Sequence, residues 1–448
     1  MQNQIENSAL PARGKASDSR TKAYVVLVLL FLFQMLNFFD KLVFGLSAVP
    51  IMQELSLSPK EFGLIGSSFF LLFSLSGTLV GIFVIGRVQT RWVLMCMALI
   101  WSVSQLPIFF SSSVAVIVVC RVILGAGEGP GLPTALHACY DWFPRERRSV
   151  PSAVVLQGIS VGFLVGSPVL SYIIHEFGWR YGFLTCGLLG ATWLVAWMLL
   201  GGEGPFAQPR STEKLAPAVE TRLPARVLWL DPSILGVMIM STMSYWIVGM
   251  AATWLPPYLQ LGLGYSPLTV GWIISAIYLF QSPLLLGASW VTQQLQSRGW
   301  SMRSNYGHAS TLALACSGLA LVLATQTAGV AQIVLIAIAF AAPSLTTIFG
   351  PVLISHVAPA AQRGMLVVVI YSANSVSGLL ANYVTGWVVD MAGGDLPHGF
   401  INAMLTAGVV LLSGAVASLL LIFPERTLRR FAGYKATSEE LFKPVELA

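Results

Sequence analysis

The stretch Arg121-Val-Ile-Leu-Gly-Ala-Gly-Glu128-Gly-Pro130 places a cation and an acid in an apolar run that begins near Val114. If this run spans a membrane, both charges lie at membrane depth, where each costs from about 2.5 to more than 10 kcal/mol. Seven helical residues separate them, so their side chains share a face but lie about 10.5 Å apart along the axis. Each therefore needs its own partner, water or a ligand. A buried charge network that only holds helices together is the structural alternative.

The whole chain has the composition of a polytopic membrane protein. Of its 448 residues, 56% are hydrophobic and 10% are charged, whereas a soluble protein carries about 25% charged residues. The net charge of +6 therefore concerns membrane orientation, and no basic cluster with interleaved aromatics points to nucleic acid. The five cysteines contain no CxxC pair and indicate neither a disulfide framework nor a metal site.

Twelve apolar segments are long enough to cross a bilayer, which takes about 20 residues each. They cover residues 24–48, 62–85, 92–110, 114–138, 151–174, 181–201, 233–258, 268–291, 307–325, 330–355, 364–389 and 399–422. A long polar stretch, 202–231, separates the sixth from the seventh. The sequence therefore predicts an all-α membrane protein with two six-helix bundles, 24–201 and 232–423, that linker, and polar tails at 1–23 and 424–448.

The distribution of Lys and Arg predicts how the chain is oriented. With the N-terminus in the cytoplasm, 21 of the 25 Lys and Arg fall in the cytoplasmic tails, linker and loops. Of the others, Lys60 and Arg180 lie outside, and Lys41 and Arg121 lie in the membrane. We therefore expect both termini in the cytoplasm and the chain in a bacterial inner membrane.

Short basic motifs repeat between the two bundles. Pro144-Arg-Glu-Arg-Arg148 follows the fourth span, and Pro359-Ala-Ala-Gln-Arg363 follows the tenth, 215 residues later. Two more matches have offsets of 211 and 212 residues: Arg87 with Arg298, and Arg91 with Arg303. The similar offsets predict duplicated six-helix bundles, an architecture of transporters whose site lies near the midplane between the halves.

A stripe of small residues marks the fifth span. Gly158, Gly162 and Gly166 repeat at four-residue spacing before Pro168. Because this spacing lets two helices approach closely, we predict a packing role for the stripe.

These features resemble the major facilitator superfamily and, within it, the anion:cation symporters, whose members carry sugar acids, aromatic acids, sialic acid and glutamate. The resemblance covers nearly the whole chain and rests on Asn37-Phe-Phe-Asp-Lys41, Arg121 to Pro130, Asp141-Trp-Phe-Pro144, Phe177-Gly-Trp-Arg180 and Arg298-Gly-Trp-Ser301. It implies that Lys41, where the family usually has Arg, binds the substrate carboxylate. It further implies that Arg121 is a second anion-facing or gating cation and that Glu128 is the principal proton carrier.

Asp40 and Lys41 interrupt the first span. Successive helix residues point about 100° apart, so the two side chains cannot contact the same group. One of them can face a cavity while the other faces a neighbouring helix. A self-neutralising pair near a helix end is the alternative. Lys offers a point charge where Arg offers a bidentate fork, so we expect a less strict carboxylate geometry. Asp40 is expected to share in proton coupling.

Two departures from the family bear on the substrate. Phe38 and Phe73 stand where the family commonly has Tyr, so two cavity hydroxyls are missing. Because an unpaired buried hydroxyl is costly, we expect an aromatic or weakly hydroxylated acid rather than a sugar acid, unless both rings face lipid or packing neighbours. Further cavity candidates are Tyr245, Trp254, Tyr278, Gln281, Tyr371 and Asn374.

A third departure concerns the cytoplasmic gate. The superfamily normally has an Asp in the loop after the second helix, with a copy after the eighth, and this Asp helps to latch the cytoplasmic side. Here the two positions are Gly86 and Gln293, so a weaker gate or a substitute latch is expected. The candidate gate residues are Arg87, Arg91, Arg148, Arg298 and Arg363.

Together these features predict a secondary active transporter for proton-coupled uptake of a small organic carboxylate by alternating access. A carboxylate that neutralises Lys41 and Arg121 removes their pull on Glu128 and favours its protonation, so anion and proton bind cooperatively. We expect no cofactor and no metal, and function as a monomer in the lipid bilayer.

Several alternatives stay open. Within transport they are a sugar-acid or dicarboxylate symporter, an anion exchanger and a drug exporter, although the fifth span lacks the Gly-Pro-Gly-Gly of drug antiporters. Outside transport, a membrane sensor is the main rival. An enzyme is not indicated, because the sequence has no HExxH, GxSxG, P-loop or Cys/His cluster.

Overall fold

The structure is a computed structural model and describes residues 13–85, 87–144, 147–207 and 223–441. Twelve of its helices are long and apolar enough to cross a membrane. The predicted all-α membrane fold is therefore confirmed. Gly86, Arg145 and Glu146, with parts of both tails and of the linker, lie outside the described residues.

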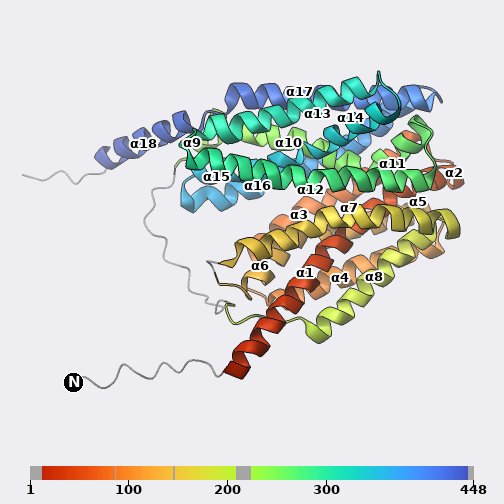
Figure 1. Cartoon of the computed structure of the whole chain (residues 1–448), viewed down its shortest axis with the longest axis horizontal. Helices are drawn as coiled ribbons and strands as arrows, with labels where there is room; N and C mark the ends of the chain where they lie inside the picture. Colours follow the sequence, from red (N-terminus) through yellow and green to blue (C-terminus); the bar gives the residue numbers. More distant parts are fainter. Residues whose placement is uncertain (1–12, 86, 145–146, 208–222, 442–448) are drawn as a thin grey trace, which may run out of the picture.

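The first half of the chain forms one group of spans (Figure 1). They are α1 (Arg13–Leu46), α3 (Pro59–Phe83), α4 (Thr90–Phe110), the pair α5 (Val114–Glu128) and α6 (Gly131–Tyr140), α7 (Ser149–Phe177) and α8 (Trp179–Leu200). The short helix α2 (Ala48–Glu54) connects α1 to α3. The apolar faces of these helices bury a continuous core.

The second half has a parallel arrangement. Its spans are α10 (Pro232–Thr253), α12 (Pro267–Ser297), η3 (Arg303–Gly307) with α13 (His308–Ala324), α14 (Gly329–Ala341) with α15 (Ser344–Val357), α16 (Ala360–Asp390) and α17 (Leu396–Leu421). Shorter elements are α9 (Ala225–Trp229), α11 (Leu255–Pro257), the π-helix η2 (Tyr258–Gly262) and α18 (Pro424–Leu441). Each half thus supplies six spans, as predicted.

Proline explains why the fourth span of each half is broken. Pro130 separates α5 from α6, and Pro343 separates α14 from α15. Proline lacks an amide N–H, so it cannot donate the hydrogen bond to the carbonyl four residues earlier, and its ring crowds that carbonyl. The first break follows Glu128 closely, so this buried acid is the last residue of α5.

The two halves meet along two helix pairs, α3 with α16 and α7 with α12. We call the end of the bundle near α9 and α18 the linker end, and the opposite end, near α2 and α11, the far end (Figure 1). Glycines let these seams close near the far end. A Cβ atom at Gly63 would overlap the carbonyl oxygen of Asn382, and one at Gly271 would overlap Ser171 Oγ.

The glycine stripe of α7 packs against α1, which confirms its predicted packing role. A Cβ atom at Gly158 would overlap the carbonyl oxygen of Phe31, and one at Gly166 would overlap the ring of Phe39. Gly162 lies between them on the same face. The close approach fixes α1 against α7 and thereby sets the position of Asp40 and Lys41 on α1.

A similar close approach joins α5 to α3. The Cα of Gly125 lies so near the Phe69 carbonyl that a Cβ atom would overlap its oxygen. We expect Gly125→Ala to force the helices apart and to lower the free energy of unfolding by about 1–3 kcal/mol. Thermal unfolding of the purified protein measures this effect.

Gly81→Ala is the matched control for that measurement. Gly81 lies in α3, the helix that Gly125 of α5 contacts, but nothing lies within 4 Å of a Cβ atom built at Gly81. Because Ala favours helix over Gly by about 1 kcal/mol, this variant should melt at or slightly above the wild-type temperature. Equal melting temperatures for the Gly81 and Gly125 variants would contradict the packing role of Gly125.

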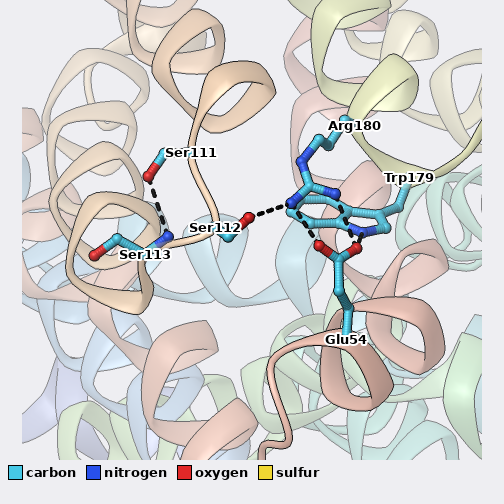
Figure 2. A network of polar contacts seen from close by, with 6 residues as sticks. All are labelled: Glu54, Ser111, Ser112, Ser113, Trp179 and Arg180. Atoms are coloured by element: carbon cyan, nitrogen blue, oxygen red, sulfur yellow. Dashed lines mark hydrogen bonds and ion pairs between the residues drawn. The ribbon is translucent and has the colours of Figure 1, made fainter.

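A polar clamp at the far end ties three connections of the first half together (Figure 2). Glu54, at the end of α2, accepts hydrogen bonds from Trp179 Nε1 at 2.8 Å and from Arg180 Nη1 and Nη2 at 2.8 and 2.6 Å. Arg180 Nη2 also donates to Ser112 Oγ at 2.8 Å, and its guanidinium stacks on the Trp179 ring at 4.2 Å. These bonds, those of Arg180 first, lower the pKa of Glu54 from 4.5 to about 2.

The lowered pKa predicts a pH-independent clamp in the physiological range. A depressed carboxyl pKa gives stability that is present above pH 4.5 and is lost only as the pH falls toward 2. Since 43% of the Glu54 side chain is exposed, Glu54→Gln should cost only about 1 kcal/mol in thermal unfolding. The difference in melting temperature between Glu54→Gln and wild type should be the same at pH 5 and at pH 8, and a difference that changes between these two pH values would contradict this view.

Candidate functional site

The site is built around an ion pair between α1 and α5. Lys41 Nζ donates to Glu128 Oε2, to Asn37 Oδ1 at 2.6 Å and to the Asn37 carbonyl oxygen at 3.3 Å. The Glu128 side chain is fully buried, and 12% of the Lys41 side chain is exposed. Glu128 Oε1 and Asn37 Nδ2 are both buried without a hydrogen-bond partner. The pair is therefore buried but incompletely satisfied, which is costly unless a further polar group completes it.

Three phenylalanine rings surround the ammonium group of Lys41. Its Nζ lies 4.7 Å from the ring centre of Phe38, 5.5 Å from that of Phe69 and 5.6 Å from that of Phe73. The two predicted residues, Phe38 and Phe73, thus both face this cation. Aromatic faces attract a cation without neutralising it. The three rings therefore hold the ammonium group in place, and its charge can still attract an anion.

Arg121 lies about two helical turns from Glu128 along α5 and is not part of the ion pair. Its guanidinium sits 4.4 Å from the Phe44 ring and 4.9 Å from the Phe69 ring. The residue is 2% exposed, and its Nε and Nη1 are buried without a hydrogen-bond partner. A buried cation with free donors is suited to bind an anion or water. As expected, Arg121 and Glu128 share a helix face but do not pair.

Asp40 points away from the ion pair although it precedes Lys41 in sequence. Gln105 Nε2 on α4 donates to Asp40 Oδ1 at 3.1 Å, and the carboxyl is 3% exposed. Lys41 meets α5 and Asp40 meets α4, so the two residues serve different places, as their 100° separation requires. Asp40 is thus a second buried acid in the same half.

The second half of the chain contributes fewer contacts to the surroundings of the Lys41–Glu128 pair. Tyr245 on α10 packs edge-on against Phe70, with ring centres 6.5 Å apart. Gln281 is 8% exposed and its Oε1 has no partner, while Asn374 Oδ1 accepts from Thr242 Oγ1 at 3.5 Å. Tyr371 and Asn374 line a small cavity between α10, α15 and α16.

Two other candidates of the second half pack against their neighbours. Tyr278 is stacked on Phe163 across the α7–α12 seam. Trp254 is fully buried and donates to the Asn382 carbonyl at 3.0 Å. Neither residue contacts Lys41 in this conformation, so their part in binding stays a prediction.

The predicted gate arginines contact groups of their own half. The acceptors are backbone carbonyls: Phe83 for Arg87, Met198 for Arg91, Tyr140 and Phe143 for Arg148, and Ala358 for Arg363. Arg298 is exposed at the end of α12. Gln293 is exposed on α12, and Gly86 lies outside the described residues. A latch between the halves through these residues therefore stays a prediction.

Three contact residues were not selected as site residues from the sequence. Asn37 lies four residues before Lys41, on the same helix face, and this spacing could have indicated it. Phe44 and Phe69 stack on Arg121, but apolar rings in a span carry no signal that separates them from packing residues.

Two six-helix halves with a charge pair buried inside one of them have the architecture of secondary transporters. The chain belongs to the Major Facilitator Superfamily, whose family model matches residues 30–349. It is therefore a membrane transporter rather than an enzyme.

Curated relatives are transporters of anions. The chain is 24% identical over 409 residues to a probable L-galactonate transporter of Escherichia coli, covering 88% of each chain. It is 24% identical over 423 residues to a probable sulfoacetate transporter of Cupriavidus necator, covering 88% of this chain and 93% of that one. It is 25% identical over 292 residues to the chloroplastic sodium-dependent phosphate transport protein 1 of Arabidopsis thaliana, and it spans 57% of that protein's length and 63% of its own.

A solved structure supports the fold. A bacterial homolog of the human lysosomal transporter Spinster, in an inward-facing and unoccupied conformation, superposes with a TM-score of 0.75 at 17% identity, covering 91% of this chain and 98% of that one. The family model and the curated relatives confirm the predicted relation to anion transporters of the superfamily.

Proposed function

We propose that the chain takes up a small organic carboxylate together with protons, and that Lys41 and Glu128 couple the two. The observation that carries this proposal is the buried pair of Lys41 and Glu128 beside Arg121, whose Nε and Nη1 lack hydrogen-bond partners. Lys41 and Arg121 bind the carboxylate, while Glu128 carries the proton. The relatives named for galactonate and sulfoacetate support an organic anion as substrate.

Charge balance couples the binding of the carboxylate to the protonation of Glu128. The Glu128 carboxylate neutralises the Lys41 ammonium in the pair that the two residues form. An arriving carboxylate that takes over Lys41 leaves Glu128 as an unpaired buried charge, which is strongly unfavourable. A proton on Glu128 removes that charge. The site therefore accepts the anion and the proton together, and the charge of the site is the same before and after.

The rings around Lys41 favour an aromatic or weakly hydroxylated acid. Phe38, Phe69 and Phe73 offer no hydrogen-bonding group to a substrate hydroxyl, and each unpaired buried hydroxyl costs about 1–3 kcal/mol. Thermal-shift measurements with benzoate, pyruvate and gluconate compare these classes on the purified protein. Stabilisation by gluconate alone would favour the alternative, a sugar-acid symporter.

We infer that the linker end faces the cytoplasm, because most Lys and Arg lie there by sequence. Among the described residues, Gly287 of α12 and Gly364 of α16 lie nearer the linker end, and nothing lies within 4 Å of a Cβ atom built on either. Near the far end, in contrast, a Cβ atom at Gly63 would overlap Asn382 of the other half, and one at Gly271 would overlap Ser171. These contacts support a conformation that is closed toward the outside of a bacterial inner membrane.

Uptake of the radiolabelled acid found by the thermal-shift screen into proteoliposomes tests the proposed function. Uptake should be fastest with an acidic exterior, slower with no pH gradient and slowest with an acidic lumen. An imposed sodium gradient should have no effect. Uptake that ignores the pH gradient but is accelerated by acid preloaded in the lumen would show an exchanger, and binding without uptake would indicate a sensor.

A further inference from the structure

Two aromatic rings from opposite halves are stacked beside the candidate site. Phe163 on α7 and Tyr278 on α12 have ring centres 3.8 Å apart and planes that differ by 2°. Their exposed fractions are 3% and 6%. The other ring pairs that join the halves, in the part of the chain that the structure describes, meet edge-on. Face-to-face rings on two helices must separate before those helices can part.

The stack occupies the middle of the α7–α12 seam. Toward the far end, Ser275 Oγ donates to the Leu164 carbonyl oxygen at 2.6 Å. Toward the linker end, Gln157 Nε2 donates to Ser282 Oγ at 2.9 Å. Both hydrogen bonds are neutral, and the large apolar contact between them is the ring pair. The stack therefore ties α7 to α12 midway between the two ends.

The stack is also one ring away from the proposed carboxylate site. The ring centre of Phe38 lies 5.4 Å from that of Phe163 and 4.7 Å from Lys41 Nζ. A Cβ atom at Gly162 would lie 3.0 Å from that of Phe38, so α7 holds this residue closely. Only the side chain of Phe38 therefore separates an acid bound at Lys41 from the ring pair.

We propose that the stack of Phe163 and Tyr278 holds the α7–α12 seam together at the level of Phe38 and so keeps the gate toward the far end closed. Alternating access requires α7 and α12 to part at this end, and the stack opposes that movement. Its removal destabilises the conformation seen here relative to one that is open at the far end, and the population shifts toward the open form. The inference rests on transport by two moving halves and is independent of the identity of the acid or of the coupled ion.

Ser171→Cys provides a probe on the far-end side of the stack. Ser171 lies on α7, is 3% exposed and faces Gly271 of the other half. Its Oγ has no hydrogen-bond partner, so the substitution removes no hydrogen bond. The rate at which a polar maleimide modifies this cysteine, measured on its peptide by mass spectrometry, reports opening of the seam. The native Cys186, 4% exposed in the first half, reports unfolding in the same sample.

In the Ser171→Cys background, Phe163→Ala should raise the maleimide reaction rate by about three- to tenfold, from the strength of a stacked pair. Tyr278→Leu should do the same from the other half. Tyr278→Phe keeps the ring and should react at the wild-type rate. Cys186 should stay unmodified in all three variants.

Three results would overturn the proposal. Unchanged modification in both Phe163→Ala and Tyr278→Leu would show that the rings do not hold the seam. An increase in Tyr278→Phe as large as that in Tyr278→Leu would assign the effect to the hydroxyl group. Modification of Cys186 in both ring-deletion variants would show that the rings stabilise the first half itself rather than a gate. None of these results depends on finding the transported acid.

Discussion

Replacing Glu128 with Gln is expected to abolish accumulation of the acid against its gradient while exchange across the membrane continues. The amide has nearly the same shape but cannot take up a proton, and it leaves Lys41 free to bind a carboxylate without one. In proteoliposomes with an acidic exterior, the ratio of internal to external acid should fall to the level without a pH gradient. Exchange of labelled for unlabelled acid should stay within about tenfold of wild type, a barrier change of about 1.4 kcal/mol.

Glu176→Gln is the control for this variant. Glu176 is an acid near the end of α7 whose side chain is 47% exposed and whose Oε1 lies 4.0 Å from His175 Nε2. Its neutralisation should leave accumulation unchanged. If Glu128→Gln still concentrated the acid under a pH difference, Glu128 would not be the proton carrier and the charge-balance scheme would fail.

Replacing Lys41 with Met is expected to lower both transport and stability. The substitution keeps the apolar chain inside the three rings but leaves the fully buried Glu128 carboxylate without its cation. Removing one partner of a buried ion pair costs about 3–5 kcal/mol. Uptake should fall to background, and the melting temperature of the purified protein should fall well below that of wild type.

The double variant Lys41→Met/Glu128→Gln separates these two effects. It removes both charges, so most of the lost stability should return, whereas uptake should remain at background because the carboxylate has no ammonium to meet. A double variant no more stable than Lys41→Met would show that the pair does not dominate the stability of this region. Uptake by the double variant would remove Lys41 from the site.

The sequence predicts the fold well because several independent features of it indicate the same architecture. Apolar segments of membrane length, an offset repeat of basic loops and a central polar stretch all point to twelve spans in two halves, and the structure has twelve such helices. Pro130 and Pro343, which break the fourth span of each half, lie inside predicted segments. The segment lengths alone do not show that these spans are made of two helices each.

The candidate site could be predicted only in part. Helix geometry separates Asp40 from Lys41 and puts Arg121 and Glu128 on one face, and both relations hold. It does not show that Lys41 pairs with Glu128, because that contact joins two helices 87 residues apart in sequence. Phe69 reaches both cations because Gly125 lets α3 approach α5, and such tertiary contacts leave no periodic pattern in the sequence.

The central claim, that an anion and a proton enter together, is tested most directly by following protons while the acid moves. Proteoliposomes that contain a trapped pH-sensitive dye start with equal pH on both sides, and the acid found in the thermal-shift screen is added outside. We predict that the lumen acidifies as the acid enters and that Glu128→Gln abolishes this signal while exchange persists. Entry of the acid through the wild-type protein with no change in lumenal pH would contradict the claim.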